Sequence, residues 1–339
     1  MERVACFGEI MLRLSPEGYL RFQQAGSFVA VYGGAEANVC ASLAQFGVKT
    51  RFITALPSHA IGQAAVNALR AIGIETDNIL IQGSRVGIYF SEKGAAQRPS
   101  KVIYDRAGSS FSQIQPGDIN WDAALDGVDW FHFTGITPAL GDNVTESVKE
   151  ALATAHRKGI RVSCDLNYRK NLWSPEKARS VMTELVQGLD LCIANEEDCK
   201  AVFGISSPGS DVDSGNLNNE GYLYVAEQMR KQFGISEMAV TLRRSHSASD
   251  NDWTAMTYDG ESHFSRSYPV HIVDRVGGGD SFGGALIYAK LKGFDAQKAV
   301  EFAAAASALK HSVEGDFNVI SLDEVERLMR GDGSGRVQR

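Results

Sequence analysis

From about residue 127 onward, short apolar runs alternate with longer amphipathic segments, and this order constrains the fold more than any other feature. The apolar runs have the length of strands, and the segments after them place apolar residues at helical spacing. The predicted pairs are a strand at 130–134 with a helix at 144–157, 161–165 with 175–185, 189–194 with 196–203, and a helix at 222–232 with a strand at 238–242. Such alternation favours a mostly parallel sheet with helices on both faces, so the expected fold class is α/β.

Two early segments do not follow this order. Residues 11–32 and 86–110 contain short stretches of strand type separated by glycine, proline and polar residues. The stretches 86–90 and 101–104 flank a polar turn, which predicts a β-hairpin. We expect a single domain over residues 1–339, in which strands from about 11–32 and 86–110 form a small sheet over the mouth of the larger one. Such a lid would exclude water from a reaction site.

Composition excludes several classes of protein. The 339 residues are 44% hydrophobic and 22% charged, as in globular proteins, and the net charge of −7 without a basic tract argues against nucleic-acid binding. No stretch approaches the roughly 18 apolar residues of a membrane span, and the first residues lack the apolar core of a signal peptide. The five cysteines are odd in number and widely spaced, which indicates reduced thiols. We expect a soluble cytoplasmic protein, with a surface loop at 206–219.

Three successive glycines stand between two aspartates near the end of the chain. An apolar run ends at Asp274, then Gly277, Gly278 and Gly279 follow, and Asp280 opens a predicted helix. Backbone N–H groups without neighbouring Cβ atoms can turn toward an anion, and the helix start adds a positive dipole end, which suits phosphate. Asp280 could then take a proton from a hydroxyl that attacks the bound phosphoryl group. The alternative is an ordinary glycine-rich loop in which Asp280 caps the helix.

Other phosphate-binding motifs are absent from the sequence. There is no G-x-x-x-x-G-K-[ST], no G-x-G-x-x-G after the first strand, and no protein-kinase signature set. The histidines show no metal-ligand spacing, so a zinc site is not indicated. A phosphate would therefore bind at residues 277–280.

The glycine run and two further motifs together resemble the PfkB (ribokinase-like) carbohydrate kinases. The family signature D-T-x-G-A-G-D-x-F is matched by D-R-V-G-G-G-D-S-F at 274–282. The family's Gly-Gly followed by Asn corresponds to Gly33, Gly34 and Asn38, and its N-x-x-E motif falls on 195–198, with Asp198 at the last place. The resemblance covers essentially the whole chain. It implies a ribokinase-like fold, with a mostly parallel sheet, helices on both faces and a small β-sheet lid.

The chain departs from this signature at two positions. Gly278 stands where alanine is usual, and it retains the backbone donors. Arg275 stands where threonine is usual and lacks the hydroxyl, beside a monovalent-cation loop that many members of the family possess. The resemblance implies ATP and Mg²⁺ as cofactors, with Asp198 as a candidate magnesium ligand through water, and a monovalent cation as a third, optional one.

Within the family, the chain is most similar to the 2-keto-3-deoxygluconate kinases, through residues 33–38, 103–109 and 165–169. Two arginines suit a sugar acid because a guanidinium can pair with a carboxylate bidentately. The resemblance implies a sugar-acid site lined by Gly33, Gly34, Asn38, Tyr89, Tyr104, Arg106, Arg169 and Asp274. The arginines could instead form surface ion pairs, and the tyrosines could simply pack within strands.

The nucleotide site is implied in the same way. Asn167, Asn195, Thr241 and Arg243 fall where family members contact ATP or its magnesium, although each could be an ordinary polar residue at a strand end. Glu36 is expected to act only on the dipole of the helix that it begins.

The implied reaction is ATP-dependent phosphorylation of the C6 hydroxyl of 2-keto-3-deoxygluconate to the 6-phosphate. Asp280 would be the general base, and Gly277, Gly278 and Gly279 would form the phosphate site. The alternatives are another PfkB-type sugar kinase such as a fructokinase, a nucleoside kinase, and a non-catalytic sugar- or nucleotide-binding relative. The edges of an open lid sheet predict a homodimer or higher homo-oligomer.

Overall fold

The computed structural model describes residues 2–207 and 219–333, so most of the predicted loop at 206–219 lies outside the described residues. The main sheet has the strand order β13-β12-β11-β10-β9-β8-β1-β4-β5, with β14 paired to β12. Neighbouring strands are parallel from β11 to β5, whereas β12 pairs antiparallel with β11, β13 and β14. The strands are β1 (Arg3–Phe7), β4 (Lys49–Leu56), β5 (Ile79–Ile81), β8 (Trp130–Thr134), β9 (Arg161–Asp165), β10 (Leu191–Ile193), β11 (Glu237–Ser245), β12 (Asp250–Tyr258), β13 (Ser262–Phe264) and β14 (Tyr268–His271).

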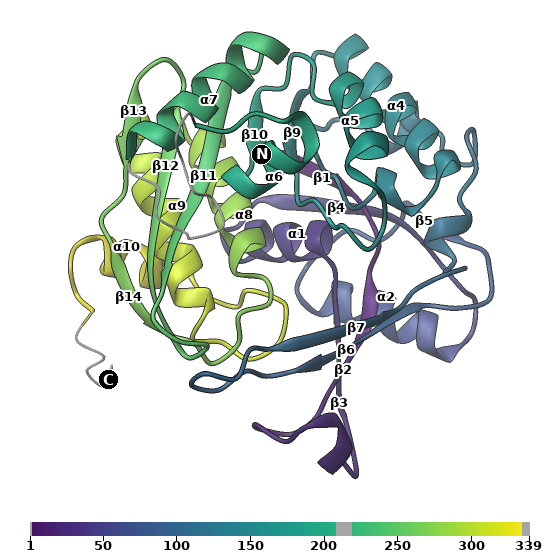
Figure 1. Cartoon of the computed structure of the whole chain (residues 1–339). Helices are drawn as coiled ribbons and strands as arrows, with labels where there is room; N and C mark the ends of the chain where they lie inside the picture. The colour runs from purple at the N-terminus through teal and green to yellow at the C-terminus, as the bar shows by residue number, and fades with distance from the viewer. Residues whose placement is uncertain (1, 208–218, 334–339) are drawn as a thin grey trace.

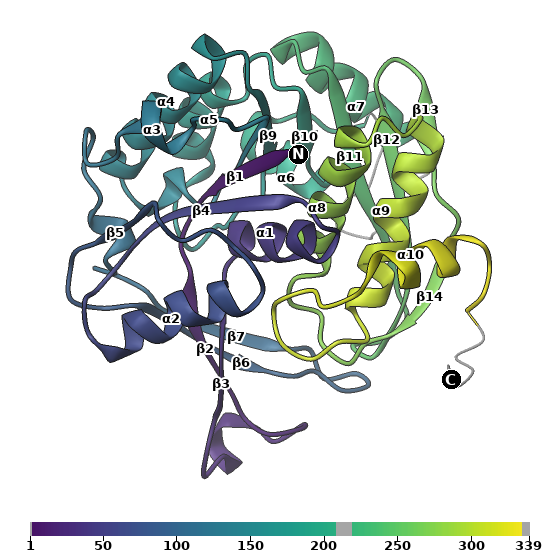
Figure 2. The same ribbon diagram turned by 180° about the vertical axis from the view of Figure 1, so that it is seen from behind.

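Helices cover both faces of this sheet (Figures 1 and 2). One face carries α1 (Ala35–Gln45), α2 (Ala60–Ala71), α8 (Gly278–Leu291), α9 (Ala296–Lys310) and α10 (Leu322–Met329). The other face carries α3 (Trp121–Ala124), α4 (Asp142–Arg157), α5 (Pro175–Leu185), α6 (Glu196–Phe203) and α7 (Asn219–Phe233). Short 3-10 helices lie at η1 (Phe22–Gln24), η2 (Phe111–Gln113) and η3 (Pro138–Leu140).

A second, four-stranded sheet projects from one end of the main sheet (Figure 1). Its order is β3-β2-β6-β7, from β2 (Met11–Ser15), β3 (Val29–Gly33), β6 (Gly87–Glu92) and β7 (Lys101–Asp105). β6 and β7 form the predicted antiparallel hairpin. All four strands come from the two segments that the sequence assigns to the lid.

The burial pattern explains the alternation in the sequence. β8 is buried along its whole length, as expected of a parallel strand with helices above and below it. The alanine-rich stretch at 303–308 lies in α9, where small side chains allow close packing against α8. The five cysteines are buried and free. The prediction of an α/β fold with a small separate sheet is confirmed.

Two details differ from the prediction. The antiparallel strands between residues 250 and 271 were not expected, and α8 begins at Gly278 instead of residue 281. In the described part of the chain, none of the helices is both long and apolar enough to cross a membrane.

Candidate active site

A cavity of about 410 Å³ lies where the parallel strands end and the lid sheet begins. Residues that follow or end strands of the main sheet form one wall, among them Glu9, Asp165 and Asn195, and the lid strands contribute Tyr89 and Tyr104. The carboxyl ends of parallel strands are the usual place for ligands in open α/β sheets. The cavity is therefore the candidate active site.

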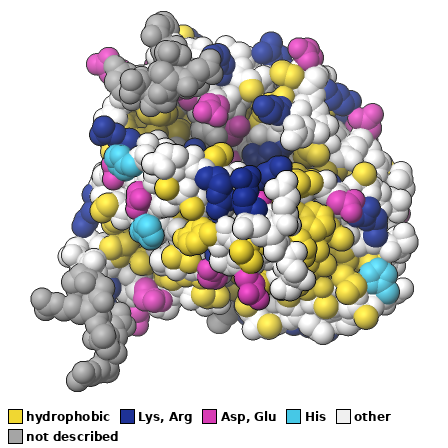
Figure 3. Space-filling model, turned by 60° about the horizontal axis from the view of Figure 1, so that its bottom comes forward, with side chains coloured by type: hydrophobic (Ala, Val, Ile, Leu, Met, Phe, Trp, Pro, Cys, Tyr) yellow, Lys and Arg dark blue, Asp and Glu magenta, His cyan; other side chains and the backbone are white. Residues whose placement is uncertain are grey.

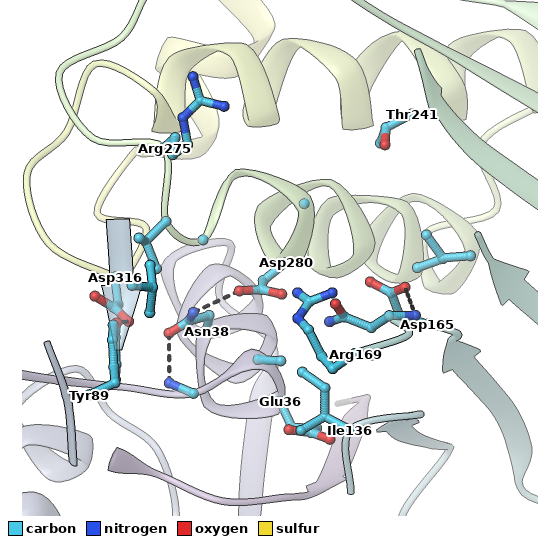
Figure 4. A pocket seen from close by; sticks show the side chains of 18 of the residues that line it. Glu36, Asn38, Tyr89, Ile136, Asp165, Arg169, Thr241, Arg275, Asp280 and Asp316 are labelled. Atoms are coloured by element: carbon cyan, nitrogen blue, oxygen red, sulfur yellow. Dashed lines mark hydrogen bonds between the residues drawn. The ribbon is translucent and has the colours of Figure 1, made fainter. Parts of the chain in front are cut away.

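Asp280 points into this cavity from the first turn of α8 (Figure 4). The N-cap of the helix is Gly277, so Asp280 is the third helical residue, and the alternative in which it caps the helix is wrong. The side-chain nitrogen of Asn38, on α1, donates to Oδ2 of Asp280 over 2.7 Å. Oδ1 of Asn38 in turn accepts from the N–H of Gly34 over 3.4 Å. This chain of contacts fixes the orientation of the Asp280 carboxyl group.

Burial raises the pKa of Asp280 to about 7. The hydrogen bond from Asn38 opposes this shift because it stabilises the charged form, whereas the charge of Glu36 adds to it. A general base is most effective when its pKa lies close to the working pH. Asp280 thus has the proton affinity that a base needs near neutrality.

The three glycines have different environments. Gly277 has φ of 82°, and a Cβ atom there would collide with the carbonyl oxygen of Asp316. Gly278 faces away from the cavity, donates to the carbonyl of Arg275 over 3.3 Å, and packs against the ring of His311. Gly277 and Gly279 line the cavity. The prediction that all three glycines face a phosphate is therefore wrong for Gly278, whose N–H group is already used in the turn.

A buried ionic cluster joins the lid to the glycine turn. Arg13, on β2, pairs with Asp274 over 2.8 Å and with Asp316 over 2.9 Å. Tyr89 donates its hydroxyl to Asp316, whose side chain also lies against Gly33. Asp274 is thus behind the cavity wall, where it holds the lid, and Tyr89 presents its ring to the cavity while its hydroxyl is engaged (Figure 4). Neither Arg13 nor Asp316 was predicted from the sequence.

Arg106 does not present a free guanidinium fork to the cavity. Its Nε donates to Oε2 of Glu9 over 2.8 Å, and its Nη2 contacts the same oxygen. Its guanidinium also lies 5.7 Å from the ring centre of Tyr104. A bidentate contact between Arg106 and a substrate carboxylate would require Glu9 to release the guanidinium group.

Arg169 is the more accessible of the two arginines. It donates to the carbonyl of Tyr168 over 3.1 Å, and Figure 4 shows its guanidinium between Asp280 and Asp165. Burial and neighbouring carboxylates raise the pKa of Asp165 well above its usual value. Burial raises the pKa of Asp198 to about 6, and the charge of Arg169 opposes that shift. This part of the cavity therefore combines a cation with carboxyl groups that would gain from a further positive charge.

The residues assigned to the nucleotide also line the cavity. Asn195 caps α6 by accepting from the N–H of Asp198 over 2.7 Å. Asn167 has φ of 40°, and its N–H donates to Asp165 over 3.1 Å. Asparagine tolerates this left-handed conformation better than most residues. Thr241 completes this group on β11.

Arg275 and His311 line the cavity as well, together with Arg243 and Trp253. Arg275 donates to the carbonyl of Ala248 over 3.1 Å, while its buried Nε has no partner in the described part of the chain. Burial and the charge of Arg243 lower the pKa of Arg275. Two guanidinium groups that repel one another suit a polyphosphate. Arg275, which departs from the family signature, thus has a place in the site.

The structure brings most of the predicted residues together. Those that line the cavity are Gly34, Asn38, Tyr89, Tyr104, Arg106, Asn167, Arg169, Asn195, Asp198, Thr241, Arg243, Gly277, Gly279 and Asp280. Gly33, Asp274 and Gly278 lie behind it. Glu36, expected to act only on a helix dipole, is buried and accepts from the hydroxyls of Thr134 and Thr137 over 2.8 and 2.7 Å. The lining residues that the sequence reasoning missed include Glu9, Glu36, Asp165, Arg275, His311 and Asp316.

The fold combines a parallel sheet with a lid of strands. At the end of the sheet, a carboxyl group with a pKa of about 7 lies at the N-terminus of a helix. Together these features are typical of the active site of a phosphotransferase. Residues 1–321 match the family described as pfkB family carbohydrate kinase, and the chain belongs to this family.

The chain is similar over almost its whole length to several proteins that are named as sugar-acid kinases. The crystal structure of a 2-dehydro-3-deoxygluconokinase from Thermotoga maritima is 51% identical, with a TM-score of 0.94, covering 98% of this chain and 100% of that one. A 2-dehydro-3-deoxygalactonokinase of Haloferax volcanii is 33% identical, covering 97% of each chain. A 2-dehydro-3-deoxygluconokinase of Thermoproteus tenax is 27% identical, covering 97% of this chain and 95% of the relative. The predicted family, fold and kinase class are confirmed.

Proposed function

We propose that this kinase transfers the γ-phosphoryl group of ATP to the C6 hydroxyl of 2-keto-3-deoxygluconate, with Asp280 as general base. The observation that carries the proposal is the position of Asp280, whose carboxyl group faces the cavity with a pKa of about 7, one turn from a helix N-terminus.

In this reaction the C6 hydroxyl gives its proton to the Asp280 carboxylate while its oxygen attacks the γ-phosphorus. The bond to the bridging oxygen breaks, and ADP leaves with that oxygen. The N–H groups of Gly279 and Asp280 lie in the first turn of α8, where a helix supplies no carbonyl partner for them. They can stabilise negative charge on the transferring group, which is a major source of rate acceleration. Arg243 and Arg275 line the same cavity, and their guanidinium groups would bind the polyphosphate.

Magnesium would supply charge neutralisation between the ATP phosphates. Asp165 and Asp198 fit this role as ligands acting through water, because both carboxyl groups line the cavity and burial raises the pKa of each. A cation there would offset the repulsion between their charged forms.

Two observations support a sugar acid as the substrate: the arginines that line the cavity and the names of the similar kinases. Arg169 is accessible to a carboxylate, and Arg106 lines the same cavity with its charge balanced by Glu9. Lys and Arg side chains also gather near the middle of the face shown in Figure 3. The similar kinases of T. maritima and H. volcanii are named for two epimeric sugar acids, 2-dehydro-3-deoxygluconate and 2-dehydro-3-deoxygalactonate. We infer the gluconate form because the relative with the higher identity carries that name.

A coupled assay of ADP release over a panel of acceptors tests the proposal. The panel contains both 2-keto-3-deoxy acids, fructose, ribose and a nucleoside. We expect the highest kcat/KM for 2-keto-3-deoxygluconate and a large loss for neutral sugars. Arg169→Gln should raise KM for the acids about tenfold or more, because a charge-assisted contact is lost. Preferred use of fructose, with no effect of Arg169→Gln, would instead identify a fructokinase.

A further inference from the structure

Lys310, the last residue of α9, carries a buried ammonium group to which the proposed reaction assigns no role. Its side chain is 0% exposed. Its Nζ donates to the carbonyl of Val313 over 3.2 Å and to that of Gly315 over 2.9 Å. A buried charge is costly unless it is paired and hydrogen-bonded. A neutral side chain would fill this place at lower cost, so the charge itself calls for an explanation.

The loop that accepts these hydrogen bonds is part of the active-site wall. Gly315 donates its N–H to Oδ2 of Asp274 over 3.1 Å, and Asp316 follows it directly. Burial lowers the pKa of Lys310, and the carboxylates of Asp274 and Asp316 oppose that shift because they stabilise the charged ammonium. Both carboxylates also pair with Arg13. Lys310 is therefore the second cation facing two buried carboxylates, and the four groups balance in charge.

The same ammonium lies directly behind the glycine turn. A Cβ atom on Gly277 would come within 3.3 Å of Cε of Lys310 and would collide with the carbonyl of Asp316. The backbone of Gly277 thus rests on the loop that Lys310 holds. A shift of the loop would move the turn and, with it, the first residues of α8 that reach Asp280.

A separate monovalent cation does not fit the same carbonyl groups. Backbone carbonyl oxygens are typical ligands of K⁺, and the N–H groups of an ammonium ion can donate hydrogen bonds to the same oxygens. Here the carbonyls of Val313 and Gly315 already face a positive group of the same charge. A further cation on them would be repelled by Lys310, and Arg275 adds a second positive charge on the neighbouring signature residue.

We propose that the Lys310 ammonium is a tethered monovalent cation, which holds the loop at 313–316 and positions the Gly277 turn, so that phosphoryl transfer needs no added K⁺ or NH₄⁺. The kinetic test of this proposal, which measures kcat/KM, rests on the kinase activity proposed above. The stability test, which measures the unfolding temperature, rests only on the ionic contacts of Lys310. Lys310 acts through the loop, so it is a positioning residue.

The first measurement compares the native protein in K⁺, NH₄⁺ and tetramethylammonium salts at equal ionic strength. We expect kcat/KM and the unfolding temperature to be the same in all three. An increase in kcat/KM of about threefold or more in K⁺ would overturn the proposal, because the native enzyme would then use an external cation. This measurement needs no variant, so a failure to fold cannot obscure it.

The second measurement uses Lys310→Ala and Lys310→Met. Alanine leaves space for a small cation on the carbonyls, whereas methionine fills it with an apolar chain. We expect both variants to lose about tenfold or more in kcat/KM. K⁺, NH₄⁺ or methylammonium should restore Lys310→Ala several-fold and raise its unfolding temperature, and should not restore Lys310→Met. Lys298→Ala, which removes an exposed lysine of the same helix, should behave as the native protein.

The two readouts separate this proposal from the proposed function. If no acceptor in the panel is phosphorylated, the cation dependence of the unfolding temperature still tests Lys310. Equal unfolding temperatures of Lys310→Ala in K⁺ and tetramethylammonium, together with native-like kcat/KM where turnover is measurable, would show that the ammonium has no such role.

Discussion

Asn38 donates a hydrogen bond to Asp280 over 2.7 Å, and this contact joins α1 to α8 at the cavity. The two residues are 242 positions apart in the chain. The contact stabilises the charged carboxylate, whereas burial favours the neutral acid. Their balance leaves Asp280 with a pKa of about 7, close enough to neutrality for proton transfer in either direction.

The first prediction concerns the pH dependence of turnover. A general base must be ionised, so kcat/KM should fall as the pH drops below about 7, the pKa of Asp280. Asn38→Leu removes a hydrogen bond to the charged form, so it should raise this pKa and move the acid limb to higher pH. A pH series of kcat/KM for both proteins checks this. If the acid limb of the pH profile is unchanged in Asn38→Leu, the titration of Asp280 is not its cause.

The second prediction concerns the buried cluster around Arg13. Arg13→Met leaves Asp274 and Asp316 without their shared partner, so the free energy of unfolding should fall by about 3–5 kcal/mol. Urea denaturation at neutral pH measures the change. Lys177→Ala, which breaks the exposed ion pair with Asp142, serves as the control and should change stability little. A comparable effect of the two substitutions would contradict the importance of the buried cluster.

The third prediction explains why glycine replaces alanine at position 278. A Cβ atom there would lie 2.6 Å from Cε1 of His311, whose ring packs against Trp253 and contacts the carbonyl of Ser307 over 2.7 Å. Gly278→Ala should therefore cost about 1–3 kcal/mol of unfolding free energy through overpacking. His311→Ala should remove most of that added cost, which a double-mutant cycle detects as coupling. Strictly additive effects would count against this explanation.

Motifs within short stretches of sequence carried most of the correct predictions. The alternation after residue 127 predicted the parallel sheet because each unit is local. The run at 277–280 predicted a helix directly after the glycines, although α8 begins at Gly278, three residues earlier than expected. Asn38 and Arg169 were found through motifs of the family. Such residues can be recognised from a few neighbouring positions in the sequence, without knowledge of the folded structure.

Contacts between distant residues could not be predicted in the same way. Arg13 and Asp316 are 303 positions apart, one in an ordinary lid strand and the other in a loop, and neither belongs to a motif. Glu9 likewise meets Arg106 only once the lid is folded over β1. The antiparallel strands after residue 250 were missed because their sequence lacks the strand–helix alternation. The homodimer stays a prediction.

The most direct test of the account is the turnover of Asp280→Asn, with binding and stability measured on the same protein. Asparagine at position 280 can still accept a hydrogen bond from Asn38. The substitution also removes a carboxyl group whose charged form is disfavoured by burial, as its raised pKa indicates. The stability contribution of Asp280 is present at low pH and is lost as the pH rises through about 7, so the variant should not be less stable than the native protein at pH 8. We predict a fall in kcat of about 10²–10⁴ or more, with the affinities for the sugar acid and ATP retained. Near-native kcat in Asp280→Asn would contradict the assignment of Asp280 as the general base.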